Sequence, residues 1–234
     1  MFIIQNYFKE LKFSFIYILI SITLTTIIFY HYNYETLYII AKPLIKSDYL
    51  PSSFNFIFTD IFEAFKMYLF LSIFMGVHTN IPFIIWHIWK FLIKGLYNYE
   101  NKIFILFIAS IILSFSIINI LFYYTIFPII IDFLIQFENS NSFNPFNIQI
   151  QLKLKDYFLI YIKFTYLFNL TFILPFITLF IKNTKWIYFK KFIYLILLII
   201  IAIITPPDIF SLVLFFLPTI IILELAHFLK KINY

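Results

Sequence analysis

Long apolar segments separated by short polar ones dominate the pattern along this chain of 234 residues. The first apolar segment has 18 residues, Phe13–Tyr30. Five more follow at 67–89, 103–127, 157–181, 192–205 and about 209–228. A bilayer core of about 30 Å needs roughly 20 helical residues to cross it. The pattern therefore predicts an all-α integral membrane protein with six transmembrane helices in a single domain spanning 1–234.

The last two predicted spans are short. At ~1.5 Å per residue, a helix over 192–205 would cover only about 21 Å. A single hairpin dipping into the membrane is an alternative, but lysines flank the pair (Lys190, Lys191, Lys230 and Lys231). Two complete crossings fit these charges better. Prolines within or beside the spans, at positions 82, 128, 175 and 218, predict kinked helices.

The lysines also predict the orientation. Eleven lie in short segments on one side: two near the N-terminus, three in 90–102, four in 182–191 and two near the C-terminus. Six lie on the other side, in or beside two longer segments, His31–Lys66 and Pro128–Asp156. By the positive-inside rule, both termini face the cytoplasm or its organellar equivalent. Within the first long segment, Tyr34–Leu44 has the pattern of an amphipathic helix at the membrane interface.

Composition excludes a soluble enzyme. Hydrophobic residues make up 63% of the chain, charged residues 12%, and the mean hydropathy is +0.98. A soluble domain is about a quarter charged. The absence of cysteine excludes disulfides and thiolate chemistry. All 17 basic residues are lysines, in no tract of five or more, so nucleic acid is not an expected partner.

Few residues are candidates for chemistry. An ionisable group inside a bilayer is costly and often functional, which singles out Glu224, Asp208 and Lys163. The simpler interpretations are a position near the inner surface for Glu224, a helix N-cap for Asp208, and a snorkelling side chain for Lys163. The four histidines lack the i,i+3 or i,i+4 spacing of a helical metal pair, so no metal or cofactor is predicted. Nothing in the sequence predicts catalysis.

Three blocks of residues together resemble one family, TatC, the core of the twin-arginine (Sec-independent) protein translocase. The most specific block is Thr205-Pro206-Pro207-Asp208, followed by Ser211, Pro218 and Glu224. A second holds Glu63-Ala64-Phe65-Lys66, Pro82, Trp89, Phe91, Gly95-Leu96-Tyr97 and Glu100. The third is Glu10-Leu11-Lys12. The resemblance covers nearly the whole chain and implies six spans in a concave arrangement.

The resemblance implies a receptor and scaffold rather than an enzyme. Its ligands would be folded precursors with twin-arginine signal peptides, bound through Glu10, Lys12 and Glu100. Carboxylates suit this role because they accept bidentate hydrogen bonds from guanidinium groups. Without the resemblance, Glu100 would be interpreted as pairing with Lys94 or Lys102. Small single-span TatA/TatB-type subunits would be partners in an oligomeric complex, driven by the proton-motive force.

Several positions depart from the family pattern. Ile173 stands where the family usually has a buried glutamate, and Asn169, one helical turn earlier, is a candidate substitute. Asn169, Asp208 and Glu224 are therefore the predicted intramembrane polar contacts, while Thr205, Pro206, Pro207 and Pro218 form the structural motif. Lys94 replaces a proline, and Lys12 replaces an arginine.

Two other classes of function stay open at this stage. A multispan ion or solute transporter or channel is the main alternative, although the chain has no internal repeats. A haem-handling membrane subunit is the other, although the histidine spacing opposes it. The Phe, Ile, Tyr, Asn and Lys bias fits an AT-rich organellar genome, which favours the mitochondrial inner membrane over a thylakoid or a bacterial inner membrane.

Overall fold

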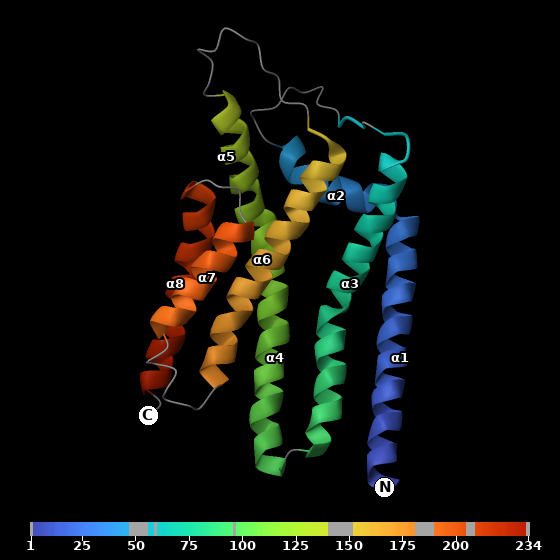
Figure 1. Ribbon diagram of the computed structural model, residues 1–234, viewed down its shortest axis with the longest axis vertical. Helices are drawn as coiled ribbons and strands as arrows, with labels where there is room; N and C mark the ends of the chain where they lie inside the picture. Colours follow the sequence, from blue (N-terminus) through green and yellow to red (C-terminus); the bar gives the residue numbers. More distant parts are fainter. Residues whose placement is uncertain are drawn as a thin grey trace. The chain divides into compact units, whose positions relative to one another are not determined.

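The computed structural model describes residues 2–46, 56–58, 60–95, 97–139, 152–180, 190–204 and 209–232 (Figure 1). Contacts divide the chain into two compact units. The first comprises Met1–Ile108 and Ile131–Phe158, and the second Ala109–Ile130 and Leu159–Tyr234. The helices α4 to α6 each contribute residues to both units.

The described residues are almost all helical. In chain order the helices are α1 (Phe2–His31), α2 (Asn33–Ile45), α3 (Glu63–Leu92), the 3₁₀ turn η1 (Ile93–Gly95), α4 (Asn98–Leu121), the π-helical turn η2 (Phe122–Ile126), α5 (Phe127–Asn139), α6 (Leu154–Phe180), α7 (Lys190–Ile204) and α8 (Ile209–Ile232). The six predicted apolar runs fall on α1, α3, α4, α6, α7 and α8. Three described segments are long and apolar enough to span a membrane: Lys9–His31, Glu63–Gly95 and Phe104–Gln136.

In the first unit, α1 lies alongside α3 over most of its length (Figure 1). Their contact is built on small and polar residues. The buried Asn80 amide donates to Thr25 Oγ1 and to the Gly76 carbonyl, both at 2.7 Å, and its Oδ1 accepts from Ser21 Oγ at 2.5 Å. A Cβ on Gly76 would collide with the Thr26 methyl group. Small residues allow close approach, and hydrogen bonds across the helices stabilise it in a membrane.

The helix predicted at Tyr34–Leu44 is present as α2. One face of α2 is buried in the first unit, with Thr36, Ile40 and Leu44 all under 8% exposed. The Tyr157 hydroxyl, at the start of α6, donates to the Ile40 carbonyl at 2.8 Å. α2 is therefore tied to α6 through its backbone as well as through its apolar face.

The helix that carries the third predicted span does not end where that span ends, at Phe127. Helical structure continues from α4 through η2 into α5, which ends at Asn139. Proline at the second position of α5 lacks an N–H, which an ordinary helix interior would need. The preceding π turn, in which the Phe127 N–H bonds to the Phe122 carbonyl, changes the hydrogen-bond register at this point. The helix therefore passes the proline instead of ending there.

Aromatic side chains fill the core of the second unit. Phe122 of η2 packs against Phe168 and Tyr161 of α6, with ring centroids 5.5 and 6.0 Å apart. Phe215 of α8, fully buried, contacts Phe164 and Phe168. Because offset or tilted aromatic pairs add to the stability gained from burial, these rings fix α8 against α6.

Candidate functional site

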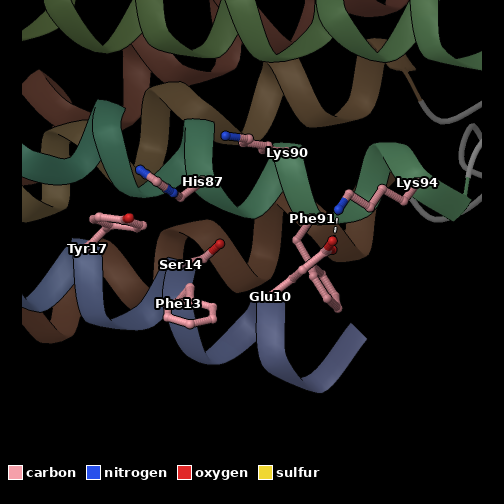
Figure 2. Close-up of a pocket in the computed structure, with 8 residues that line it drawn as sticks. All are labelled: Glu10, Phe13, Ser14, Tyr17, His87, Lys90, Phe91 and Lys94. Atoms are coloured by element: carbon pink, nitrogen blue, oxygen red, sulfur yellow. Dashed lines mark ion pairs between the residues drawn. The ribbon is translucent and has the colours of Figure 1, made fainter. Parts of the chain in front are cut away.

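An open cavity of about 270 Å³ lies between the start of α1 and the end of α3, within the first unit (Figure 2). Its lining follows one face of each helix. On α1 the lining residues are Glu10, Phe13, Ser14 and Tyr17; on α3 and η1 they are His87, Lys90, Phe91 and Lys94. Both sets have the i, i+3, i+4, i+7 spacing of a single helical face. The cavity is therefore a groove between two helix faces, at the end of the unit that carries the Lys9–Lys12 and Lys90–Lys102 lysines.

The charged end of the cavity is formed by an ion pair between Glu10 Oε2 and Lys94 Nζ (Figure 2). The two side chains are 46% and 41% exposed, so water reaches both. Lys94 belongs to η1, the turn that follows α3. The Lys90 amine points away from Glu10. One carboxylate, already occupied by a cation, is thus presented at the rim of the cavity.

Aromatic rings form the walls of the cavity. Tyr17 stacks on His87 with centroids 6.3 Å apart, and Phe83 meets the same imidazole edge-on at 4.3 Å. The His87 Nδ1 atom is buried and has no hydrogen-bond partner. Phe13 and Phe91 complete the apolar lining. Such walls next to a carboxylate suit a flat cation, because a guanidinium group can stack on aromatic faces while it pairs with an acid.

The other two predicted signal-peptide residues are placed less fully. Lys12 is exposed on α1, outside the cavity lining. Glu100 lies in the first turn of α4, and its side chain is outside the described residues. Lys94, one of the two lysines that could have paired with Glu100, pairs with Glu10.

Asn169 belongs to the second unit, on α6, and its side chain is 5% exposed. Its amide donates to Asn119 Oδ1 on α4 at 2.9 Å and to the Thr165 carbonyl at 2.8 Å. The Asn119 amide in turn donates to Asn169 Oδ1 at 3.3 Å and to the Phe115 carbonyl at 2.8 Å. Both N–H groups of each amide are therefore used. The pair joins α4 to α6, and Ile173 lies half-buried one turn further along α6.

Glu224 lies on the exposed side of α8, and its Oε1 accepts a hydrogen bond from the Tyr194 hydroxyl of α7 at 2.8 Å. This bond connects the two short predicted spans within the second unit. Pro218 lies inside α8 and is half-buried. Lys163 is exposed on α6. The predicted residues Thr205, Pro206, Pro207 and Asp208 lie outside the described residues.

Among the residues described, no group of three or more histidines and carboxylates could hold a metal ion. Sequence reasoning did not find the cavity partners of Glu10, nor Asn119 and Tyr194. The sequence did contain a pattern that could have indicated the cavity. Residues with the i, i+3, i+4, i+7 spacing occur at the start of the first predicted span (10–17) and again at the end of the second (87–94). For Asn119 and Tyr194 no such signal existed, since both are uncharged residues within apolar runs.

Comparisons with known proteins agree with one another. A family model described as Sec-independent protein translocase protein (TatC) matches residues 6–218. The chain is 34% identical to a tatC-like protein, ymf16, of Reclinomonas americana, over 98% of this chain and 87% of that one. It is 30% identical to the ymf16 protein of Nephroselmis olivacea, over 97% and 93% of the two chains. The TatCy protein of Bacillus subtilis is 26% identical, over 84% and 79%.

Solved structures give the same result for the fold. A crystal structure of the twin arginine translocase receptor TatC superposes with a TM-score of 0.75 at 23% identity, covering 97% of this chain and 98% of that one. A second, in the detergent DDM, has a TM-score of 0.77 at 22% identity, covering 96% and 99%. The predicted all-α, six-span fold class is confirmed by this likeness.

Proposed function

The chain belongs to the TatC family of Sec-independent protein translocase proteins, and we propose that the cavity between α1 and α3 is where it receives the signal peptide of a precursor. The supporting observation is the Glu10 carboxylate at the rim of an aromatic cavity, already paired with a cation. One arginine of a twin-arginine signal would take the place of that cation. The guanidinium group would donate one hydrogen bond to each oxygen of the carboxylate and stack on a wall of the cavity.

Glu100 and Lys12 complete the proposed site. Glu100 lies on the segment that follows η1, six residues after Lys94, which lines the cavity. Two arginines need two acceptors, and Glu10 and Glu100 are the acids that the chain carries near this end. Lys12 contributes to the basic surface around the site, which fits a contact with polar backbone groups of the precursor better than a contact with its arginines.

The chain is a translocase component of the membrane, not an enzyme. Its partners in this proposal are folded precursors with twin-arginine signals and TatA/TatB-type single-span subunits, in an oligomeric complex driven by the proton-motive force. The Glu224–Tyr194 pair supports an intramembrane polar contact on the α7–α8 face, since Glu224 is exposed on a helix surface that would otherwise meet lipid. Asp208 is proposed as a further contact of this kind. Asn169 is proposed to contribute by positioning, because its hydrogen bonds are taken up by Asn119.

The proposed location is the mitochondrial inner membrane, with both termini on the matrix side. The codon-biased composition supports it, as does the likeness to the two ymf16 proteins. The comparisons give no support to the transporter alternative.

Site-specific photo-crosslinking tests the proposed receptor site. A photoreactive residue replaces Phe13 in the cavity wall, and the matched control replaces Ile28, an exposed apolar residue on the same helix. Membranes that contain each variant receive a precursor with a twin-arginine signal, or the same precursor with two lysines. We expect a crosslink at position 13 that depends on the arginines, and none at position 28. Equal crosslinking of both precursors, or none at position 13, would contradict the proposed site.

A further inference from the structure

The cation that occupies Glu10 belongs to the chain itself. Lys94 reaches the carboxylate from η1, across the groove between α3 and α1 (Figure 2). This is the same carboxylate that the proposed function assigns to an incoming arginine.

The geometry allows the pair to open. Both side chains are almost half exposed, and ion pairs with such access to water are weak. A lysine has a flexible four-carbon stem and holds a carboxylate as a point charge, without the fixed fork of a guanidinium. The Lys94 side chain is 41% exposed, so it borders water into which the amine can move.

We propose that Lys94 is a built-in competitor for the Glu10 carboxylate, and that it sets how tightly this receptor binds cationic signal peptides. The inference rests on the proposed function. When the pair is closed, the carboxylate is unavailable, so the apparent affinity of a ligand equals its intrinsic affinity multiplied by the fraction of molecules in which the pair is open. For a weak exposed pair this lowers the affinity about two- to sixfold.

The competition affects every cationic ligand by the same factor. A closed Glu10–Lys94 pair excludes an arginine and a lysine alike, so the ratio of their affinities does not change. Lys94 thus determines the strength of binding, and the preference for arginine comes from the bidentate geometry of the guanidinium group. Lys94 therefore changes the affinity for cationic peptides without changing the selectivity between arginine and lysine.

Peptide binding to the full-length protein in lipid nanodiscs tests the inference. The probes are fluorescent synthetic signal peptides with two adjacent arginines or two lysines, followed by anisotropy. The variants are Lys94→Gln, Lys94→Arg, Glu10→Gln and the double variant Glu10→Gln/Lys94→Gln. Lys90→Gln is the matched control, because it removes the same charge from the same cavity lining while its amine points away from Glu10.

We expect Lys94→Gln to tighten binding of both peptides about two- to sixfold, with their ratio unchanged, and Lys94→Arg to give no tightening. Lys90→Gln removes only a distant positive charge that repels the cationic peptides, so it should raise their affinity by less than Lys94→Gln does. When Glu10 is already replaced by Gln, adding Lys94→Gln should raise the peptide affinity by no more than Lys90→Gln raises it in the unmodified protein. An equal gain from the two lysine variants, or a gain that persists without Glu10, overturns the role of Lys94 while leaving the receptor site in place. If Glu10→Gln binds the twin-arginine peptide as well as the unmodified protein, the proposed site fails, and the role of Lys94 fails with it.

Discussion

At the scale of single residues, the most informative pair is Asn119 and Asn169. A buried carboxylic acid in a membrane needs a partner or a proton, whereas an amide pair satisfies itself by exchanging hydrogen bonds. We expect Asn119→Leu and Asn169→Leu each to lower the free energy of unfolding by about 1–2 kcal/mol, because the first leaves a buried amide and the second a half-buried amide without its partner. Equilibrium unfolding in mixed micelles with increasing SDS measures this.

The double variant is the sharper test of that pair. Removing both amides leaves no unpaired group, so the two costs should not add, and the coupling free energy should be about 0.6–1.7 kcal/mol. Ser116→Ala is the control, since its exposed hydroxyl bonds only to the Ile112 carbonyl of its own helix. Additive costs, within about 0.3 kcal/mol, would show that the bonds between α4 and α6 contribute no stability.

These residues also show what the sequence could and could not predict. Glu10 could be selected from the sequence as a candidate functional acid, because it is one of few charges beside a transmembrane segment and lies in a recognisable block. Its pairing with Lys94 was not predictable, since it depends on the register between α1 and α3. That register is fixed far from the ion pair, by Asn80 and Gly76. The residues around Glu10 and Lys94 contain no information about a helix register that is set at another part of α1 and α3.

At the scale of helices, the contact between α1 and α3 depends on Gly76. We expect Gly76→Ala to lower the free energy of unfolding by about 1–3 kcal/mol, because the added methyl group meets the side chain and backbone of Thr26 and forces the two helices apart. The same unfolding measurement in mixed micelles checks this. A shift of α1 relative to α3 should also weaken binding in the cavity, which both helices line.

Gly95→Ala is the matched control for Gly76→Ala. A Cβ at this position meets open space, so the change should be neutral or raise stability by up to about 1 kcal/mol. Thr26→Ser removes the methyl group that would collide and should restore part of the stability lost in Gly76→Ala, but not all, since the Thr26 backbone stays close. Equal effects of the two glycine variants would contradict the importance of close helix packing.

The helices differ in how well their pattern predicted them. The amphipathic face of α2 was visible because Thr36, Ile40 and Leu44 recur at the helical period. The continuation of the helix through η2 into α5 was not visible in the sequence, because Pro128 is a standard signal for a helix end. Only the inserted π turn allows the helix to pass it, and a π turn depends on packing, here of Phe122 against α6, rather than on local sequence.

At the scale of the whole molecule, the distribution of lysines predicts the orientation in the membrane. The Glu10–Lys94 ion pair supports one part of it, since it places the N-terminal lysines and those of 90–102 at the same end of the first unit. The absence of cysteine makes a direct test simple, because any introduced cysteine is the only one in the chain. Phe58 and Tyr97 are suitable positions, as both are exposed and uncharged and lie on either side of α3.

We expect Phe58→Cys to react with a membrane-impermeant maleimide added outside sealed mitoplasts, and Tyr97→Cys to react only after the membrane is disrupted. The physical reason is that short lysine-rich segments stay on the side from which the protein inserts. Neither substitution alters a charge, so the variants keep the lysine distribution that is under test. The reverse labelling would overturn the orientation and place Glu10 on the side opposite to an arriving precursor. Labelling of both cysteines from outside would instead show that α3 does not cross the bilayer.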